Sequence, residues 1–223
     1  ASVVAQTFTD WECIVVDDGS KDDTWKVLEE ARAKIGDRLV IHRLDRNRGR
    51  GGARQAALDR TRGRYLAMVD ADDWVYPEKL ATQLRYAERH PQAVAIGGTM
   101  SVYDDPFHLV GMHTQGVVPH ATELGPWNDL HQPPIPHAPS LLDARLARAQ
   151  GFDLSLRTSE DTDFLLGLIL GQRFVLIPEV VYAYSEPGSI TLPKLLQSYA
   201  ATGRIMRKHA VRYPAAYVRE RAK

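Results

Sequence analysis

The segment Tyr65-Leu66-Ala67-Met68-Val69-Asp70-Ala71-Asp72-Asp73 runs from an apolar stretch directly into three carboxylates. In an extended segment alternate side chains share a face, so Asp70 and Asp72 are predicted to point the same way. Two carboxylates held together repel each other unless a cation or a proton lies between them. Mg²⁺ and Mn²⁺ prefer such hard oxygen ligands. The segment therefore predicts either a metal site at a strand end or, more simply, a strand followed by a helix whose first turn contains Pro77 and Glu78.

A second acidic strand end lies earlier, in Glu12-Cys13-Ile14-Val15-Val16-Asp17-Asp18-Gly19-Ser20. The apolar run predicts a short buried strand, and the glycine predicts a turn. Ser20 and Asp23 resemble a capping box ahead of the next helix, which explains both residues but gives Asp17 and Asp18 no structural role. Ligands of open α/β sheets bind beyond the carboxyl ends of the strands, and both acidic clusters lie at such ends.

The composition is that of an ordinary globular protein of one domain, with 223 residues, 44% hydrophobic and 25% charged. A formal net charge of +0 argues against a nucleic-acid-binding protein, which would be basic. The single cysteine, Cys13, rules out an internal disulfide and fits a reducing compartment, so we expect a cytoplasmic location. We expect no signal peptide, and the longest apolar stretch, residues 164–177, is too short to span a membrane.

Strand-like and helix-like segments alternate over the first hundred residues, which predicts an α/β fold with parallel strands and crossover helices. Between residues 103 and 139 the pattern fails, in a proline-rich region of the kind that often carries function. The expected strands are residues 12–17, 39–44, 65–69, 93–99 and 173–177, and the expected helices are 24–34, 51–61, 77–89, 140–150 and 159–171. A C-terminal helix is expected to place on roughly one face the apolar residues Leu192, Leu195, Leu196, Tyr199 and Met206.

Several short motifs follow one another in order between residues 6 and 189. They are Gln6-Thr7-Phe8-Thr9-Asp10-Trp11-Glu12, Val15-Val16-Asp17-Asp18-Gly19-Ser20, Asn47-Arg48-Gly49, Ala53-Arg54-Gln55, Asp70-Ala71-Asp72-Asp73, Gly151-Phe152-Asp153 and Ser159-Glu160-Asp161-Thr162-Asp163. Each motif is weak alone, but the ordered set with this spacing closely resembles the family 2 glycosyltransferases.

The resemblance implies the GT-A fold, a Rossmann-like mixed α/β sheet flanked by helices. Residues 1–100 would form the nucleotide-sugar-binding half, residues 101–190 the acceptor-binding half of the same domain, and residues 191–223 a C-terminal helical extension. The implied activity is the inverting, metal-dependent transfer of a sugar from a nucleoside-diphosphate donor to a hydroxyl of a glycan or lipid-linked acceptor. Family habit favours a UDP-sugar, and polysaccharide biosynthesis at the cell envelope as the setting.

The same resemblance assigns roles residue by residue. Asp161 matches the catalytic base, Asp72 and Asp70 match the ligands of Mn²⁺ or Mg²⁺, and residues 133–140 should contribute to the acceptor or donor-sugar pocket. The residues implied to bind the nucleotide or donor are Asp17, Asp18, Arg54, Asp70 and Glu160. A carboxylate near the acceptor hydroxyl can act as general base, and a guanidinium suits phosphate oxygens.

Simpler alternatives stand beside these assignments. Arg54 could lie on a solvated helix face, and Asp161 could be one of several acidic residues that favour a helix N-terminus. His137, in the proline-rich region, could touch a diphosphate or metal but fits a structural role better. The competing functions are a sugar nucleotidyltransferase and a catalytically silent nucleotide-sugar or glycan-binding domain.

The two ends of the chain raise separate expectations. The family opens with a strand ahead of Gln6, where this sequence has only residues 1–5; we expect that strand to exist in the full protein, because the sheet would otherwise expose an edge. Residues 182–185, Tyr-Ala-Tyr-Ser, stand where the family often has Tyr-Arg. Residues 194–223 contain eight basic residues and one acidic residue, so this end could contact an anionic membrane at its inner face, or form a solvated charged face behind an apolar stripe.

Overall fold

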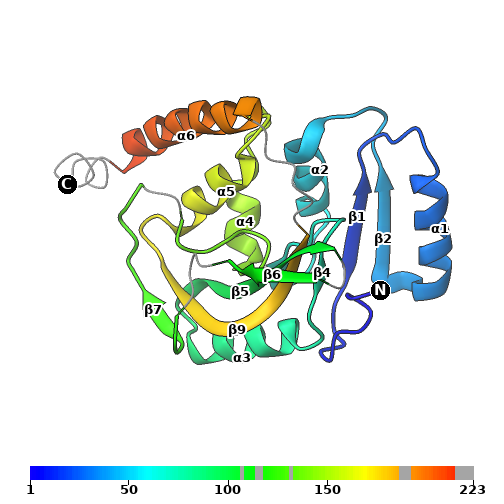
Figure 1. Cartoon of the computed structure of the whole chain (residues 1–223), viewed down its shortest axis with the longest axis horizontal. Helices are drawn as coiled ribbons and strands as arrows, with labels where there is room; N and C mark the ends of the chain where they lie inside the picture. Colours follow the sequence, from blue (N-terminus) through cyan, green and yellow to red (C-terminus); the bar gives the residue numbers. More distant parts are fainter. Residues whose placement is uncertain (106–107, 114–117, 131–132, 186–191, 214–223) are drawn as a thin grey trace.

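The computed structural model of the 223-residue chain describes all residues except 106–107, 114–117, 131–132, 186–191 and 214–223 (Figure 1). The helices are α1 (Thr24–Ile35), α2 (Gly49–Leu58), α3 (Lys79–Arg89), α4 (Ala144–Gln150), α5 (Glu160–Ile169), α6 (Leu192–Arg212) and the short 3-10 helix η1 (Gly36–Arg38). The strands are β1 (Cys13–Asp17), β2 (Leu39–Arg43), β3 (Tyr65–Ala67), β4 (Trp74–Val75), β5 (Ala93–Asp105), β6 (His108–Met112), β7 (Thr122–Leu124), β8 (Leu141–Asp143) and β9 (Arg173–Ser185).

The strands form two sheets. β1 and β2 pair in parallel as a two-stranded sheet, and the larger sheet has the order β3-β8-β5-β9-β4, with β6 on β5 and β7 on β9. In the larger sheet β5 and β9 are parallel, whereas β3 pairs with β8 antiparallel. The predicted mixed α/β architecture is therefore confirmed, but the expectation of parallel pairing throughout the first hundred residues is wrong. Among the described residues β1 pairs only with β2, so no strand pairing joins the two sheets.

The core lies on both faces of the larger sheet. Helices α4 and α5 cover one face and α3 covers the other, as Figure 1 shows. Phe164 of α5, Leu142 of β8 and Phe174 of β9 are fully buried there. In contrast, α1 has no buried residue and most of β1 is only partly buried, so the small sheet adds little to the core.

Two local predictions are wrong. Residues 141–143 of the expected 140–150 helix form β8, because they pair with β3 and β5, and Asp143 then caps α4 by accepting a hydrogen bond from the Leu146 N–H at 2.9 Å. The capping box before α1 is absent as well. The helix follows Asp23, whose side chain makes no cap bond, while the Ser20 N–H donates to Asp17 instead.

The C-terminal helix α6 packs on α5, but not through the predicted stripe. Its buried residues are Ala201, Ile205 and His209, whereas Leu192, Leu196 and Tyr199 are exposed. The Leu195 side chain lies outside the described residues, as do residues 191 and 214–223 of the predicted extension. Within the described part of the chain no helix is long and apolar enough to span a membrane.

Candidate active site

The acidic segment after β3 is a turn rather than an extended strand end. β3 ends at Ala67, three residues before Asp70, and the Asp73 N–H donates to the Asp70 carbonyl oxygen at 3.2 Å. The prediction that strand alternation places Asp70 and Asp72 on one face is therefore wrong, because no strand continues to these residues. Asp72 is exposed and Asp70 is partly buried. The turn presents both carboxylates at the edge of the sheet.

Tyr182 of β9 fixes this turn. Its hydroxyl donates to Asp73 Oδ2 at 2.7 Å and accepts from the Asp70 N–H at 3.0 Å, and the Ser185 N–H donates to Asp73 Oδ1 at 2.7 Å. Burial raises the pKa of Asp73. Asp73 is thus an anchor of the turn, which leaves Asp70 and Asp72 as its outward carboxylates. Sequence reasoning missed Tyr182; alternation along β9 would place it on a buried face but would not reveal its partner.

Arg54 of α2 connects this turn to the start of α5. Its Nη2 lies 2.8 Å from Asp70 Oδ1, and its Nη1 lies 2.8 Å from Glu160 Oε1. Its side chain is 12% exposed, which excludes the alternative of a solvated helix face. Burial opposes the charge on Arg54, but Asp70, Asp161 and Glu160 outweigh this effect and raise its pKa. Arg54 is therefore a permanently charged link between two acidic elements.

Glu160 is the buried member of this network. Its side chain is 1% exposed, and Arg50 adds a second cation, with Nε 3.2 Å from Oε1. A buried carboxylate needs such partners, because the loss of its hydration would otherwise be uncompensated. Sequence reasoning placed Glu160 among donor-binding residues; in the structure both of its cations come from α2. Its position joins α2 to the N-terminus of α5.

Asp161, the next residue, is only partly buried. Its Oδ1 accepts from the Thr162 N–H at 2.8 Å, and its charge acts on both Arg54 and His137. Ser159, which precedes α5, has the left-handed backbone conformation with φ 60°, an uncommon geometry for a non-glycine residue that often accompanies functional sites. The helix start therefore turns sharply, with Glu160 inward and Asp161 nearer to solvent.

His137 lies behind this cluster. Its ring packs edge-on against Phe152 and Phe164, and burial together with the charge of Arg54 lowers its pKa to about 4. The imidazole is therefore neutral at physiological pH and is unsuited to charge neutralisation. Within the described residues its Nε2 has no hydrogen-bond partner. The packing fits the structural role expected of it.

The loop of residues 133–140 is fixed to the core by α3. The Pro139 carbonyl oxygen accepts from Lys79 Nζ at 2.9 Å and from Gln83 Nε2 at 2.7 Å. Burial lowers the pKa of Lys79 to about 7. Ile135 of this loop is also buried. The loop thus carries His137 toward Arg54 and Asp161 on a rigid support.

Asp17 and Asp18 lie apart from these residues, at the end of β1 in the small sheet. Asp17 is buried; its Oδ1 accepts from the Ser20 N–H at 2.8 Å, and Arg43 Nε lies 3.1 Å from Oδ2 without forming a well-aligned hydrogen bond. Asp18 Oδ1 accepts from the Arg48 N–H at 2.7 Å. Both residues therefore have the structural role that sequence reasoning did not find, because Asp17 contacts the end of β2 and Asp18 binds the loop after β2.

The residues that fit a metal ion are Asp70 and Asp72. No group of three or more histidine, cysteine, aspartate or glutamate side chains converges on a metal-like position within the described residues. Mg²⁺ and Mn²⁺ do not need such a cage, since they are commonly held by one or two carboxylates together with water and substrate phosphates. Two accessible carboxylates in one turn fit this mode, although Oδ1 of Asp70 is already paired with Arg54.

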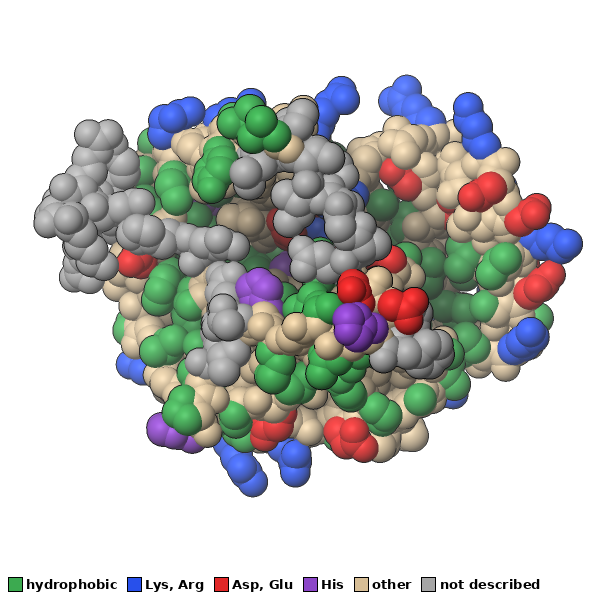
Figure 2. All heavy atoms as spheres, in the orientation of Figure 1, with side chains coloured by type: hydrophobic (Ala, Val, Ile, Leu, Met, Phe, Trp, Pro, Cys, Tyr) green, Lys and Arg blue, Asp and Glu red, His purple; other side chains and the backbone are tan. Residues whose placement is uncertain are grey.

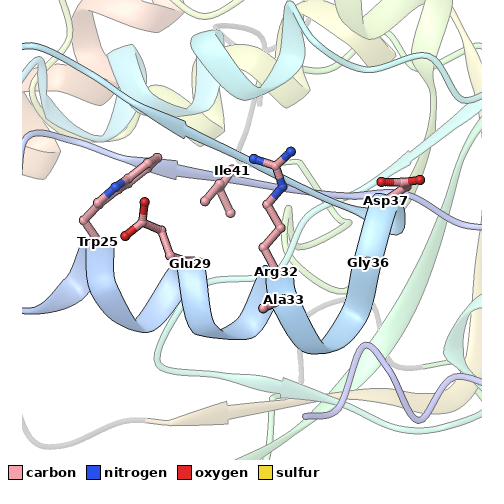
Figure 3. Close-up of a pocket in the computed structure, with 7 residues that line it drawn as sticks. All are labelled: Trp25, Glu29, Arg32, Ala33, Gly36, Asp37 and Ile41. Carbon is pink, nitrogen blue, oxygen red and sulfur yellow. The ribbon is translucent and has the colours of Figure 1, made fainter.

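Two hollows of the surface lie outside this cluster. One, of about 360 Å³, lies between α1 and β2, where Figure 3 shows Ile41 of β2 between the side chains of Trp25 and Arg32; its other lining residues are Glu29, Ala33, Gly36 and Asp37. A second, of about 270 Å³, lies beside α2. None of the predicted site residues lines either hollow, so both are left out of the candidate site.

The chain matches the model of "Glycosyl transferase family 2" over residues 1–138. It is 38% identical over 97 residues to the putative teichuronic acid biosynthesis glycosyltransferase TuaG of Bacillus subtilis, covering 44% of this chain and 38% of TuaG. It is 33% identical over 87 residues to the Escherichia coli UDP-Glc:alpha-D-GlcNAc-diphosphoundecaprenol beta-1,3-glucosyltransferase WfaP, covering 39% of this chain and 34% of WfaP. The chain spans less than half the length of these relatives.

Solved structures show the same fold. S. aureus TarS (residues 1–349, with UDP) has a TM-score of 0.72 at 22% identity, covering 92% of this chain and 58% of that one. The mannosyltransferase PcManGT from Pyrobaculum calidifontis, with GDP-Man and Mn²⁺, has a TM-score of 0.68 at 20% identity, covering 91% and 58%. The predicted GT-A architecture is thereby confirmed.

Proposed function

Because the chain belongs to glycosyl transferase family 2, we propose that it transfers a sugar from a nucleoside-diphosphate donor to a hydroxyl group, in a metal-dependent reaction that inverts the anomeric configuration. The observation that supports this proposal is the double contact of Arg54. It links Asp70, on the side of the proposed metal site, to Glu160, which adjoins the proposed base Asp161. The guanidinium of Arg54 would thus connect the proposed metal and donor site to the residues beside the proposed catalytic base.

In this proposal Asp161 acts as the general base. The acceptor oxygen forms a bond to the anomeric carbon while the bond from that carbon to the phosphate oxygen breaks, and the proton of the hydroxyl passes to Asp161. One displacement of this kind inverts the configuration. A partly exposed carboxylate at a helix start is reachable by a hydroxyl, whereas the neighbouring Glu160 is occupied by two arginines.

Donor binding falls to the remaining residues. Asp70 and Asp72 would hold Mn²⁺ or Mg²⁺, which supplies charge neutralisation for the departing diphosphate. The Nη2 side of Arg54 would add a hydrogen bond to the diphosphate. Asp17 and Asp18 would bind the nucleoside end of the donor, from the separate small sheet. Asp18 keeps a second carboxylate oxygen besides the one that accepts the Arg48 N–H, whereas the two oxygens of the buried Asp17 face the Ser20 N–H and Arg43.

We further propose a UDP-sugar as donor and a glycan or lipid-linked acceptor. The support is that TarS was solved with UDP and that WfaP is named for a UDP-glucose donor and a diphosphoundecaprenol acceptor. PcManGT was solved with GDP-Man and Mn²⁺, which supports a divalent ion and makes a guanine nucleotide the alternative to UDP. The proposed setting is cell-envelope polysaccharide synthesis on the cytoplasmic side of the membrane, with peripheral contact through the C-terminal helical extension.

The test is a donor panel. The protein, with Mn²⁺ and a mixture of glycan and lipid-linked acceptors, is assayed for nucleotide release and for transferred sugar, beside the Asp161→Asn variant. The proposal expects acceptor-dependent release of UDP, lowered by roughly 10²–10⁴-fold in the variant, the usual scale for general-base catalysis. Pyrophosphate release would instead identify a nucleotidyltransferase, and binding without release would identify a silent binding domain. An unimpaired Asp161→Asn variant would refute the base assignment.

A further inference from the structure

Helix α6 is held to the start of α5 by polar contacts as well as by apolar packing. Asp163, which is fully buried, accepts from His209 Nε2 at 2.9 Å and from Lys208 Nζ at 2.8 Å. Near the other end of the interface the hydroxyl oxygens of Ser159 and Ser198 lie 3.2 Å apart. The inner face of α6 therefore has a fixed position relative to the helix that carries Asp161.

The outer face of α6 is apolar at its first two turns. Leu192, Leu196 and Tyr199 are 68%, 59% and 68% exposed, and their spacing of four and three residues places them in one row along the helix. Single exposed apolar residues are ordinary, but packing among the described residues does not explain a row of three large ones on a helix. These three residues are called the outer row below.

Basic side chains follow the outer row on the exposed side of α6. Arg204 and Arg207 are both exposed, and the helix from Leu192 to Arg212 contains no aspartate or glutamate. In Figure 2 hydrophobic and basic side chains lie next to each other along the upper edge of the molecule, where Figure 1 places α6. An apolar row beside unopposed positive charge is the pattern of a helix that lies in the plane of a membrane surface.

We propose that the outer face of α6 binds the surface of an anionic phospholipid bilayer. The outer row would enter the boundary between headgroups and acyl chains, and Arg204 and Arg207 would contact anionic headgroups. Charge complementarity favours this occupant, because a surface with cations and no carboxylate fits a negative surface rather than a second copy of itself. The benefit of membrane binding, access to a lipid-linked acceptor, rests on the proposed function. The observations that support membrane binding do not depend on that function.

A bilayer bound to the outer face of α6 would lie close to the proposed active site. A helix with its side chains is about 10 Å across, and the inner face of α6 contacts Ser159, two residues before Asp161. A bilayer bound to the outer face would therefore lie roughly one helix diameter from the start of α5. An acceptor whose headgroup projects from the same bilayer would be delivered at the level of the proposed base.

The experiment is flotation of the 223-residue protein with vesicles, without nucleotide or sugar. Vesicles of phosphatidylcholine containing phosphatidylglycerol should bind the protein, and pure phosphatidylcholine should bind it at least tenfold less, since each cation near an anionic surface adds substantially to binding. Binding should weaken in high salt. The variants Leu196→Ser/Tyr199→Ser and Arg204→Gln/Arg207→Gln should each lower binding roughly tenfold.

The matched control is Val27→Ser/Lys34→Gln on α1, an equally exposed pair on another helix, which should bind like the unmodified protein. Circular dichroism of every variant establishes that it folds. Absence of binding to anionic vesicles, or equal binding by the outer-row variant, would overturn the proposal. So would concentration-dependent self-association in sedimentation velocity that the outer-row variant abolishes, because the row would then bind a second copy. No outcome depends on transfer activity, so failure of the transferase assay remains distinguishable.

Discussion

Removal of Arg54 is predicted to destabilise the protein strongly, because Glu160 would be left buried with too little opposite charge. Glu160 is 1% exposed, and its remaining cation, Arg50, is 64% exposed and contributes little. Breaking a buried ion pair from one side costs about 3–5 kcal/mol. Asp70 is 38% exposed and can be hydrated, so its loss of Arg54 adds at most about 1 kcal/mol. We expect Arg54→Ala to lower the free energy of unfolding by about 3–6 kcal/mol.

A double-mutant cycle isolates the pair. Glu160→Gln removes the charge but keeps an acceptor, so it should cost about 1–3 kcal/mol. In Arg54→Ala/Glu160→Gln no charge is left buried, and the loss should be smaller than the sum of the two single losses by about 1–3 kcal/mol. The control is the ion pair of Arg62 with Glu12, whose closest atoms are 2.7 Å apart; Arg62 is 76% exposed, Glu12 is 19% exposed and keeps two backbone N–H donors, so Arg62→Ala should cost about 0–1 kcal/mol.

The free energies come from urea unfolding followed by circular dichroism and extrapolated linearly to water. The slope of the extrapolation must stay constant across the variants for the values to be compared. If Arg54→Ala costs no more than Arg62→Ala, or if the cycle shows coupling below about 0.5 kcal/mol, the reasoning that Arg54 and Glu160 form a buried charged link is refuted.

Three further outcomes are expected. Calorimetry should show UDP binding that EDTA abolishes and that Asp72→Asn weakens; equal affinity with and without EDTA would contradict the metal role. Tyr182→Phe, which removes the hydroxyl that fixes the acidic turn, should lower the free energy of unfolding by about 1–3 kcal/mol, measured by urea unfolding. Hydrogen bonds from Ser155 and Lys208 lower the pKa of Asp153 to about 2. The ionised carboxylate therefore stabilises the fold fully at pH values above the ordinary carboxyl pKa, and this stabilisation is lost as the pH falls toward 2. In Asp153→Asn the free energy of unfolding should depend less on pH in that window.

The elements that sequence predicts well are those set by local pattern. Strands β1 and β2 and helices α1 and α3 begin and end within about two residues of expectation, because the period of apolar residues and the turn residues between them are local signals. For residues 141–143 the sequence predicts a helix, because an apolar pair before an alanine-rich run fits either period. They form a strand because β3 and β5 pair with them on either side, and the sequence around residues 141–143 does not indicate that pairing.

In the site too, the sequence identifies residues within short motifs but not the partners that they contact from distant parts of the chain. Motifs name the carboxylates, since each stands in a short ordered stretch. The partners are not readable in this way: Arg54 meets Glu160 across 106 positions of sequence, and Tyr182 meets Asp73 across 109. The structural contacts of Asp17 and Asp18 are not readable for the same reason, because their partners Arg43 and Arg48 lie in and after a different strand.

The two contacts of Arg54 make its structural and proposed functional roles compatible. Nη1 faces a carboxylate that is 1% exposed, so this side of the guanidinium is committed to the fold. Nη2 faces Asp70, which is 38% exposed, so this side borders solvent, where a donor diphosphate can approach. In the proposed reaction Asp70 would also hold the metal ion, and Nη2 would be the nitrogen of Arg54 that contacts the donor phosphate. Because lysine offers one point charge instead of a planar fork, it cannot hold Glu160 and reach a second anion at once. The chemistry therefore accounts for an arginine at this position.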